Sequence, residues 1–105
     1  MPLGEEIVAF IDEHDFHILE NESEKLVIEE LGKQLGSHKG VICKCNTCVV
    51  DMAAMALNTV KPLYRVSLLG TQYASQAIHE TAYAKSLKDS VSKAIEKVRK
   101  NPAHD

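Results

Sequence analysis

The chain has 105 residues and a mass of 11.6 kDa, a size that supports one small domain and excludes two-domain enzymes. Apolar residues make up 45% and charged residues 26% of the sequence, which excludes a disordered tail and a membrane protein. The net charge is −3 and the only arginines are Arg65 and Arg99, so we expect no sequence-specific binding to duplex nucleic acid.

The N-terminal residues and the cysteine count bear on the cellular compartment. Glu5, Glu6 and Asp12 lie where a signal peptide would carry positive charge. The longest uncharged apolar run, Met52–Leu57, is far shorter than the roughly 18 residues of a spanning helix. We therefore expect a cytoplasmic protein without a membrane partner. Three cysteines are an odd number for a disulfide framework, and a reducing cytosol favours metal or redox chemistry for them.

The charges are distributed unevenly along the chain. Ten of the 15 acidic residues lie between Glu5 and Glu30, and six of the 12 basic residues lie between Lys85 and Lys100. Two explanations remain open. Acidic residues favour the first turns of helices and basic residues the last turns, or an acidic arm or a basic face meets a partner.

Two helices are predicted in the first 40 residues. Apolar residues recur at helical spacing between Leu3 and Ile11, whereas residues 15–20 break the pattern and are predicted to be extended. Asn21 and Glu24 have the spacing of a capping box, which predicts that the second helix begins there. The buried stripe of that helix is predicted to comprise Leu26, Val27, Leu31 and Leu35, and its end is predicted at Gly36 and Gly40.

A third helix is predicted after the cysteine-rich segment Val41–Cys48. Asn46 or Thr47 can act as its N-cap, and the helix continues to about residue 58. Its sequence is apolar nearly all round apart from Asp51, so we expect it to be central in the fold.

A short strand and a long final helix complete the predicted elements. Residues 63–69 alternate as a strand does, Gly70 turns the chain, and Thr71 can cap a helix of about 30 residues. The apolar heptad positions of that helix are Ala77, Ala84, Leu87, Val91, Ala94 and Val98, with Ile78 and Ile95 beside them. Because so long a helix extends beyond a domain of this size, packing its apolar seam against a second copy predicts a homodimer.

The spacing Cys43-x-Cys45-x-x-Cys48 is the strongest chemical signal in the sequence. Thiolates are strong soft ligands, and a following helix lowers their pKa through its dipole. The spacing predicts a zinc ion in a tetrahedral site, which needs a fourth ligand from elsewhere. Among the five histidines we favour His104, because Pro102 stiffens the turn before it and a ligand there pins the C-terminus to the cysteine loop.

Other interpretations of these residues remain open. His38 and His79 are alternative fourth ligands. The cysteines can instead be small buried hydrophobes, a redox-sensing pair, or ligands of an iron–sulfur cluster. A catalytic zinc site would need an open coordination position and an acid or base such as Asp51. His79-Glu80 begins like a zincin helix, but Tyr83 takes the place of the required second His, so we predict no enzymatic activity.

Three motifs occur together in the sequence. The central one is Cys43-x-Cys45-x-x-Cys48-x-x-Asp51-x-x-Ala54-x-x-Leu57-Asn58, followed by Pro62 and Tyr64. The flanking ones are Asn21-x-x-Glu24-x-x-Val27 and Asn101-Pro102-x-His104. Together they resemble the signature of the late-competence ComFB family, from about residue 21 to residue 104.

The resemblance implies a small, mostly helical, dimeric, zinc-binding protein without established catalysis, and some relatives are thought to be receptors for cyclic dinucleotides. It makes residues 1–20 an N-terminal extension and residues 21–105 a ComFB-like domain. The expected fold class is mostly α: a compact, zinc-stabilised, dimeric helical domain with a long C-terminal helix and at most one or two short strands. The family often has Pro-Pro-Arg-Tyr where this chain has Lys61-Pro62-Leu63-Tyr64-Arg65, so Arg65 is the residue that can replace the missing arginine.

Three functions follow from these observations. The first is a non-enzymatic signalling protein that binds an anionic ligand such as cyclic di-GMP or cyclic di-AMP, because Lys61, Tyr64 and Arg65 cluster cations beside a flat side chain. The second is a structural or adaptor protein, in which zinc only stabilises the fold and a charged face binds an unidentified protein partner. The third, a metallohydrolase, has the least support from the sequence.

Overall fold

Helices account for most of the described chain. A computed structural model describes residues 2–66 and 80–102, with side chains from residue 6 onward. The elements in chain order are α1 (Pro2–Asp12), the 3₁₀ helix η1 (Phe16–Ile18), β1 (Glu20–Asn21), α2 (Glu22–Ser37), α3 (Asn46–Leu57), β2 (Tyr64–Arg65) and α5 (Thr81–Lys100). The fold class is mostly α, with a long C-terminal helix and a two-stranded sheet, as the sequence predicts.

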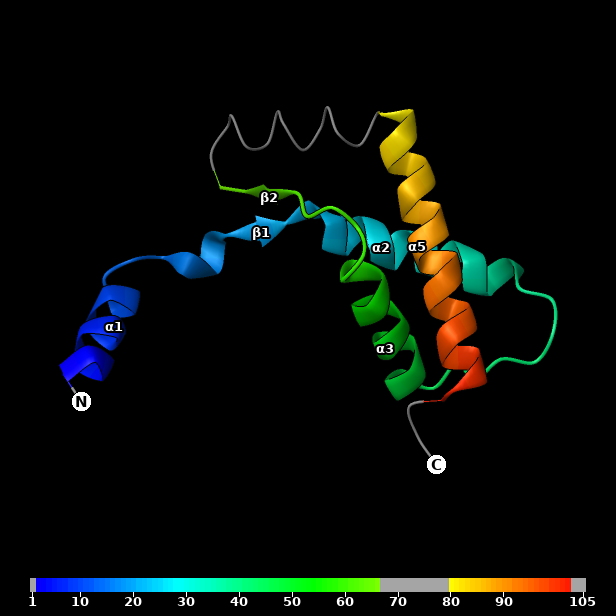
Figure 1. Cartoon of the computed structure of the whole chain (residues 1–105), viewed down its shortest axis with the longest axis horizontal. Coiled ribbons are helices and arrows are strands. Elements are labelled where there is room, and N and C mark those ends of the chain that lie inside the picture. Colours follow the sequence, from blue (N-terminus) through cyan, green and yellow to red (C-terminus); the bar gives the residue numbers. More distant parts are fainter. Residues whose placement is uncertain (1, 67–79, 103–105) are drawn as a thin grey trace.

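The core lies where α2, α3 and α5 meet. All three helices contact one another, and α5 runs antiparallel to α3 (Figure 1). Val27 and Val91 are fully buried, and burying a side chain of this size contributes about 1.5–3 kcal/mol. The buried apolar residues are Val27, Leu31, Leu35, Cys48, Met52, Ala56, Val60, Leu63, Tyr83, Val91, Ala94, Ile95 and Val98.

The predicted start of α2 is confirmed. Asn21 is the N-cap, and its side-chain oxygen accepts hydrogen bonds from the backbone amides of Ser23 at 3.1 Å and of Leu63 at 2.7 Å. One side chain therefore satisfies an early helical amide and fixes the segment that precedes β2. The end predicted at Gly36 and Gly40 brackets the observed one, because the helix ends at Ser37 and His38 is the C-cap.

Less of the chain is extended than the sequence predicts. Residues 16–18 form η1, not an extended stretch, and β1 then pairs antiparallel with β2, with Glu20 opposite Arg65. The strand predicted over 63–69 comprises Tyr64 and Arg65, while residues 67–69 lie outside the described residues.

The beginning of the last helix was predicted wrongly. Its N-cap is Glu80, so α5 has 20 residues, and Thr71, the predicted cap, lies outside the described residues. Of the seam predicted to pair with a second copy, Ala84 is exposed, and Ala77 and Ile78 lie outside the described residues. The remaining seam residues pack inside the subunit, because α2 and α3 both lie against α5 and bury them. The apolar residues on this seam are Leu87, Val91, Ala94, Ile95 and Val98.

The helix α3 is buried on one face only. The prediction that it is central is confirmed for Met52 and Ala56, which are both 1% exposed, but Val50 on the other face is 57% exposed. Its N-cap is Cys45, not Asn46 or Thr47.

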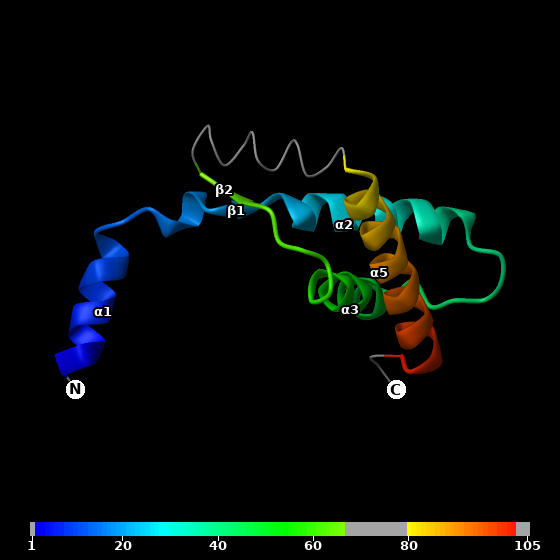
Figure 2. The same cartoon turned by 45° about the horizontal axis from the view of Figure 1, so that its top comes forward.

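The N-terminal part of the chain extends away from the core. In both views α1 lies apart from α2, α3 and α5 (Figure 1, Figure 2). The radius of gyration is 17.2 Å, compared with about 13 Å for a compact domain of this length. The compact domain that the sequence predicts is therefore the helical core alone. No helix within residues 2–66 and 80–102 is both long and apolar enough to cross a membrane.

A buried hydrogen-bond network joins α2, α5 and the segment before β2. The Ser23 hydroxyl, fully buried, donates to the Lys61 carbonyl at 2.6 Å. Since its one proton is used there, it accepts from the Tyr83 hydroxyl at 2.9 Å.

We predict that Ser23→Ala destabilises the protein more than Tyr83→Phe does. The alanine removes the closest partner of both the Lys61 carbonyl and the Tyr83 hydroxyl and leaves these two groups with a mutual contact of 3.5 Å, at a cost of about 1–3 kcal/mol. The phenylalanine removes one bond but leaves the Ser23–Lys61 bond intact, at a cost of about 1 kcal/mol. Urea unfolding of the two variants measures the difference, and an equal or reversed order contradicts the proton assignment.

We predict opposite effects on stability when two different glycines are replaced by alanine. Gly32 lies in α2 with open space around it, so Gly32→Ala is expected to stabilise the protein by about 0.5–1 kcal/mol. Gly40 has a φ of +127°, which a side chain disfavours, so Gly40→Ala is expected to destabilise it by about 1–3 kcal/mol. Urea unfolding tests both, and each variant is the control for the other.

Candidate metal centre and ligand pocket

The three cysteine sulfurs converge at the beginning of α3. The Sγ atoms of Cys43, Cys45 and Cys48 all lie within 4.8 Å of one another. Cys45 is the N-cap, and its sulfur accepts a hydrogen bond from the Cys48 backbone amide at 3.5 Å. This helical turn brings residues 45 and 48 to the same end of α3, and Gly40 redirects the chain shortly before Cys43.

The environment favours a thiolate at Cys43. Hydrogen bonds from the Cys45 backbone amide, and then from the Cys45 and Cys48 thiols, lower the pKa of Cys43 below its ordinary value. The positive end of the α3 dipole acts in the same direction. Cys48 is buried, Cys43 is half-buried and Cys45 is exposed, so the group is open to solvent on one side.

The cluster fits a zinc ion. With a Zn–S distance of about 2.3 Å, tetrahedral geometry places two sulfurs roughly 3.8 Å apart. Separations of at most 4.8 Å therefore need only a small adjustment. When bound, zinc would crosslink the loop before α3 to its first turn and neutralise the three thiolates.

The position of the C-terminus bears on the fourth ligand. Because α5 is antiparallel to α3, its C-terminal end lies beside the beginning of α3 (Figure 1). The described chain ends at Pro102, and His104 lies outside the described residues, as does His79. His38 is described but does not belong to the group of converging ligand atoms. The direction of α5 thus brings the chain toward the cysteines two residues before His104.

We predict that Cys45→Ser abolishes metal binding. Serine cannot replace a thiolate, so the metal content measured by mass spectrometry should fall from about one zinc per chain to near zero. A stability loss of about 2 kcal/mol or more should then lower the Tm by roughly 10 °C.

The matched control is Lys44→Ser, an exposed neighbour in the same loop, which should leave the zinc content unchanged. His104→Ala should weaken zinc retention against a chelator if His104 is the fourth ligand. Full zinc content in the Cys45→Ser protein would contradict the assignment of this centre.

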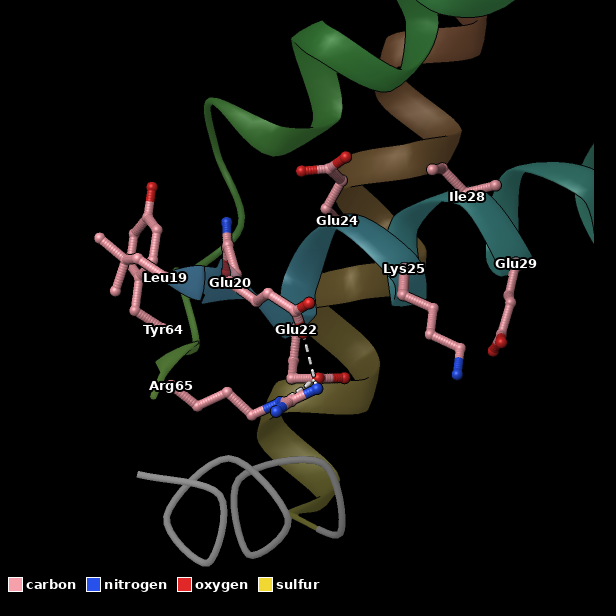
Figure 3. A pocket seen from close by; sticks show the side chains of 10 residues that line it. Leu19, Glu20, Glu22, Glu24, Lys25, Ile28, Glu29, Tyr64 and Arg65 are labelled. Carbon is pink, nitrogen blue, oxygen red and sulfur yellow. Dashed lines mark hydrogen bonds and ion pairs between the residues drawn. The ribbon is translucent and has the colours of Figure 1, made fainter. Parts of the chain in front are cut away.

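A separate pocket lies between the sheet and the first turns of α2. It has a volume of about 710 Å³, and Figure 3 shows its side chains projecting from β1, α2 and β2. Its lining residues are Leu19, Glu20, Asn21, Glu22, Glu24, Lys25, Ile28, Glu29, Tyr64 and Arg65. Two of the three residues predicted to bind a ligand, the sequence neighbours Tyr64 and Arg65, therefore line this pocket.

The guanidinium of Arg65 is held by two carboxylates. It donates to Glu20 at 2.7 Å and also to Glu22 (Figure 3). The hydrogen bond to Glu22 is the main cause that raises the pKa of Arg65 above its ordinary value. Neither partner was predicted from the sequence, although the position of Glu20 and Glu22 in the acidic N-terminal third was a visible signal.

The third predicted residue, Lys61, does not line this pocket. Its carbonyl is the acceptor for Ser23 in the buried network. The backbone of Lys61 thus has a structural role, while its exposed side chain lies three residues before Tyr64 in the chain.

Comparison with known proteins assigns the family. The sequence model of the late competence development protein ComFB family matches residues 20–102, which is most of the chain. This chain belongs to the ComFB family. No curated protein sequence matches it.

The ComFB fold is also found among solved structures. The late competence protein ComFB from Bacillus subtilis, described in a structural characterization, matches with a TM-score of 0.58 and 22% sequence identity. The match covers 81% of this chain and 94% of the Bacillus subtilis chain. At this identity the likeness concerns the fold. The family match begins at residue 20, where β1 begins, so α1 and η1 precede it.

Proposed function

We propose that this ComFB-family chain is a cytoplasmic, homodimeric, non-enzymatic regulatory protein that holds one structural zinc ion and binds a cyclic dinucleotide. The zinc ligands in this proposal are Cys43, Cys45, Cys48 and His104. The ligand-binding residues are Tyr64 and Arg65, with Lys61 beside them. The observation that carries the proposal is the convergence of three sulfurs at one helix N-terminus in a chain of this family.

A structural role for zinc follows from the donor set. Three thiolates and one imidazole complete a tetrahedral shell and leave no open position for a reacting water. This donor set is the basis for proposing a non-enzymatic protein. Thiolate ligands require reduced cysteines, and the three cysteines are free thiols, which supports the proposed location in a reducing compartment.

The pocket at β2 has features that suit a cyclic dinucleotide. A volume of about 710 Å³ is in the usual range for small-molecule sites. Tyr64 is 56% exposed, and its ring offers a flat surface for stacking on a base. Arg65 is the guanidinium that can pair with a phosphate in two parallel bonds.

The acidic residues of the pocket oppose an anionic ligand. Glu20, Glu22, Glu24 and Glu29 outnumber Lys25 and Arg65, and Arg65 is already paired. A phosphate must therefore displace carboxylates from the guanidinium, which lowers affinity and makes it sensitive to the charge of Glu22.

We predict opposite effects on ligand affinity for two variants of this pair. Titration calorimetry with cyclic di-GMP and with cyclic di-AMP should show no binding to Arg65→Ala. Glu22→Gln should tighten binding by about 5–10-fold, since removing a competing charge from a partly exposed pair contributes about 1 kcal/mol.

The matched control is Glu29→Gln, which lines the same pocket and changes the charge equally but does not pair with Arg65. It should change affinity less than Glu22→Gln does. Absence of heat from the unsubstituted protein with both nucleotides would remove the proposed ligand, and the adaptor function would then remain.

The adaptor function is favoured by a different surface. A groove along α5 is lined by four lysines, Lys85, Lys93, Lys97 and Lys100, and such a basic surface suits an acidic protein segment. In this alternative, zinc stabilises the fold and the groove binds the partner.

A further inference from the structure

The residues before the family match form an acidic and apolar arm. We define the N-terminal arm as residues 6–19, the part of α1 with described side chains together with η1 and its flanking residues. It has four acidic residues and no lysine or arginine, and all of its residues are exposed. The acidic residues are Glu6, Asp12, Glu13 and Asp15.

The apolar side chains of the arm lack a core to pack against. Each of the four on α1 is between 51% and 57% exposed, and α1 lies apart from the helical core in both views (Figure 1, Figure 2). These residues are Ile7, Val8, Phe10 and Ile11. Contiguous exposed apolar residues of this kind mark an interaction surface.

The arm has internal order of its own. The Phe10 ring lies 4.6 Å from the His14 ring and 5.6 Å from the Phe16 ring, measured between centroids. The Phe10 carbonyl and His14 Nδ1 are 2.8 Å apart, within hydrogen-bond distance. This cluster joins the end of α1 to η1, so the arm can dock as a preformed unit with a smaller loss of conformational entropy.

At the other end of the molecule, α5 has a basic groove of complementary character. We define the basic groove as the cavity that is lined by α5 and the end of α3. It has a volume of about 1040 Å³. Four lysines and two acidic residues line it, which gives a net charge of 4 − 2 = +2. Its apolar residues are Met55, Ala82 and Ala94, and the methylene stems of the lysines add to this surface.

The dimensions of the two surfaces are compatible. The groove follows α5 from Ala82 to Lys100, which corresponds to roughly 27 Å at 1.5 Å per residue. The 11 residues of α1 span about 16 Å. The groove is therefore long enough to hold the whole of α1.

We propose that the N-terminal arm of one copy docks in the basic groove of a second copy, and that the exchange is reciprocal. The proposal rests on the homodimer of the proposed function and names its surface. A two-fold axis lets each copy give one arm and receive one, which closes the assembly. Burial of the apolar face of α1 supplies affinity, and the opposite charges fix its orientation.

Three features favour a second copy over the same copy as the occupant. The arm and the groove lie at opposite ends of the molecule (Figure 1, Figure 2). The segment that directly follows the arm is fixed to β2, because Glu20 pairs with Arg65 and β1 pairs with β2. The part of the predicted α5 seam from Leu87 to Val98 packs against α2 and α3, which favours a dimer that uses another surface.

The test is a charge exchange in the full-length protein, measured by analytical ultracentrifugation at low micromolar concentration. The arm variant is Asp12→Lys with Glu13→Lys, and the groove variant is Lys93→Glu with Lys97→Glu. We expect the unsubstituted protein to be a dimer and the Kd of each variant to rise at least tenfold. An equimolar mixture of the two variants should form a heterodimer, because each arm then meets a groove of opposite charge.

A groove control is Lys33→Glu with Lys39→Glu, which changes the net charge equally on residues that do not line the basic groove. It should leave the dimer intact. A fourfold variant that combines the arm and groove changes in one chain should also dimerise.

Each other outcome overturns the proposal. A monomeric unsubstituted protein excludes the exchange, and dimers of unchanged Kd in both variants assign the interface to another surface. A fourfold variant that is compact but monomeric, together with no association in the mixture, shows that the arm docks on its own subunit. Zinc content and cyclic dinucleotide binding are measured on the same proteins. Neither pair of substitutions lies at the metal centre or in the pocket at β2, so failure of those measurements is distinguishable from failure of the exchange.

Discussion

The apolar seam of α5 has to be covered, and α2 and α3 cover it within one subunit. This packing determines the position of two other features. It places α3 antiparallel to α5, so the cysteine-bearing end of α3 lies beside the C-terminal end of α5. It also leaves the opposite, lysine-rich face of α5 exposed as a groove. The candidate metal centre and the basic groove are thus two consequences of one helix packing.

A second constraint operates at the junction between the arm and the core. Asn21 caps α2 and also accepts from the Leu63 amide, while Arg65 pairs with Glu20 and Glu22 on both sides of that cap. A few polar contacts therefore fix β1 to β2 and at the same time line the pocket proposed for the nucleotide. A phosphate that takes Arg65 from Glu20 would weaken a contact at the base of the arm. The pocket proposed for the ligand and the base of the arm are therefore adjacent in the structure.

The cysteine cluster depends on local contacts and on charge neutralisation, unlike the long-range packing of the helices. Its three sulfurs lie on one loop and one helical turn, so the sequence brings them close with little long-range folding. Three thiolates at such separations repel one another unless a cation neutralises them. A bound metal ion would therefore link the ionisation of the cluster to the stability of the loop, and a ligand near the C-terminus would extend that link to the end of α5.

Local patterns in the sequence determined the helices, the cap at Asn21 and the convergence of the cysteines, because the contacts involved span only a few residues. Helical spacing predicted α1 and the buried stripe of α2, and the three cysteines and their neighbours were sufficient to indicate the family. The sequence did not determine where α5 begins, since Thr71 and Glu80 are both compatible with a helix start.

Only the tertiary structure decided which apolar surfaces are buried and which remain exposed. The heptad pattern of α5 is the same whether its seam meets a second copy or its own α2 and α3, so periodicity cannot distinguish the two. The pairing of Arg65 with Glu20 and Glu22 joins residues more than 40 positions apart, and the exposure of Val50 and of α1 depends on which elements lie next to them. These properties depend on long-range packing, which a linear pattern of residue types does not encode.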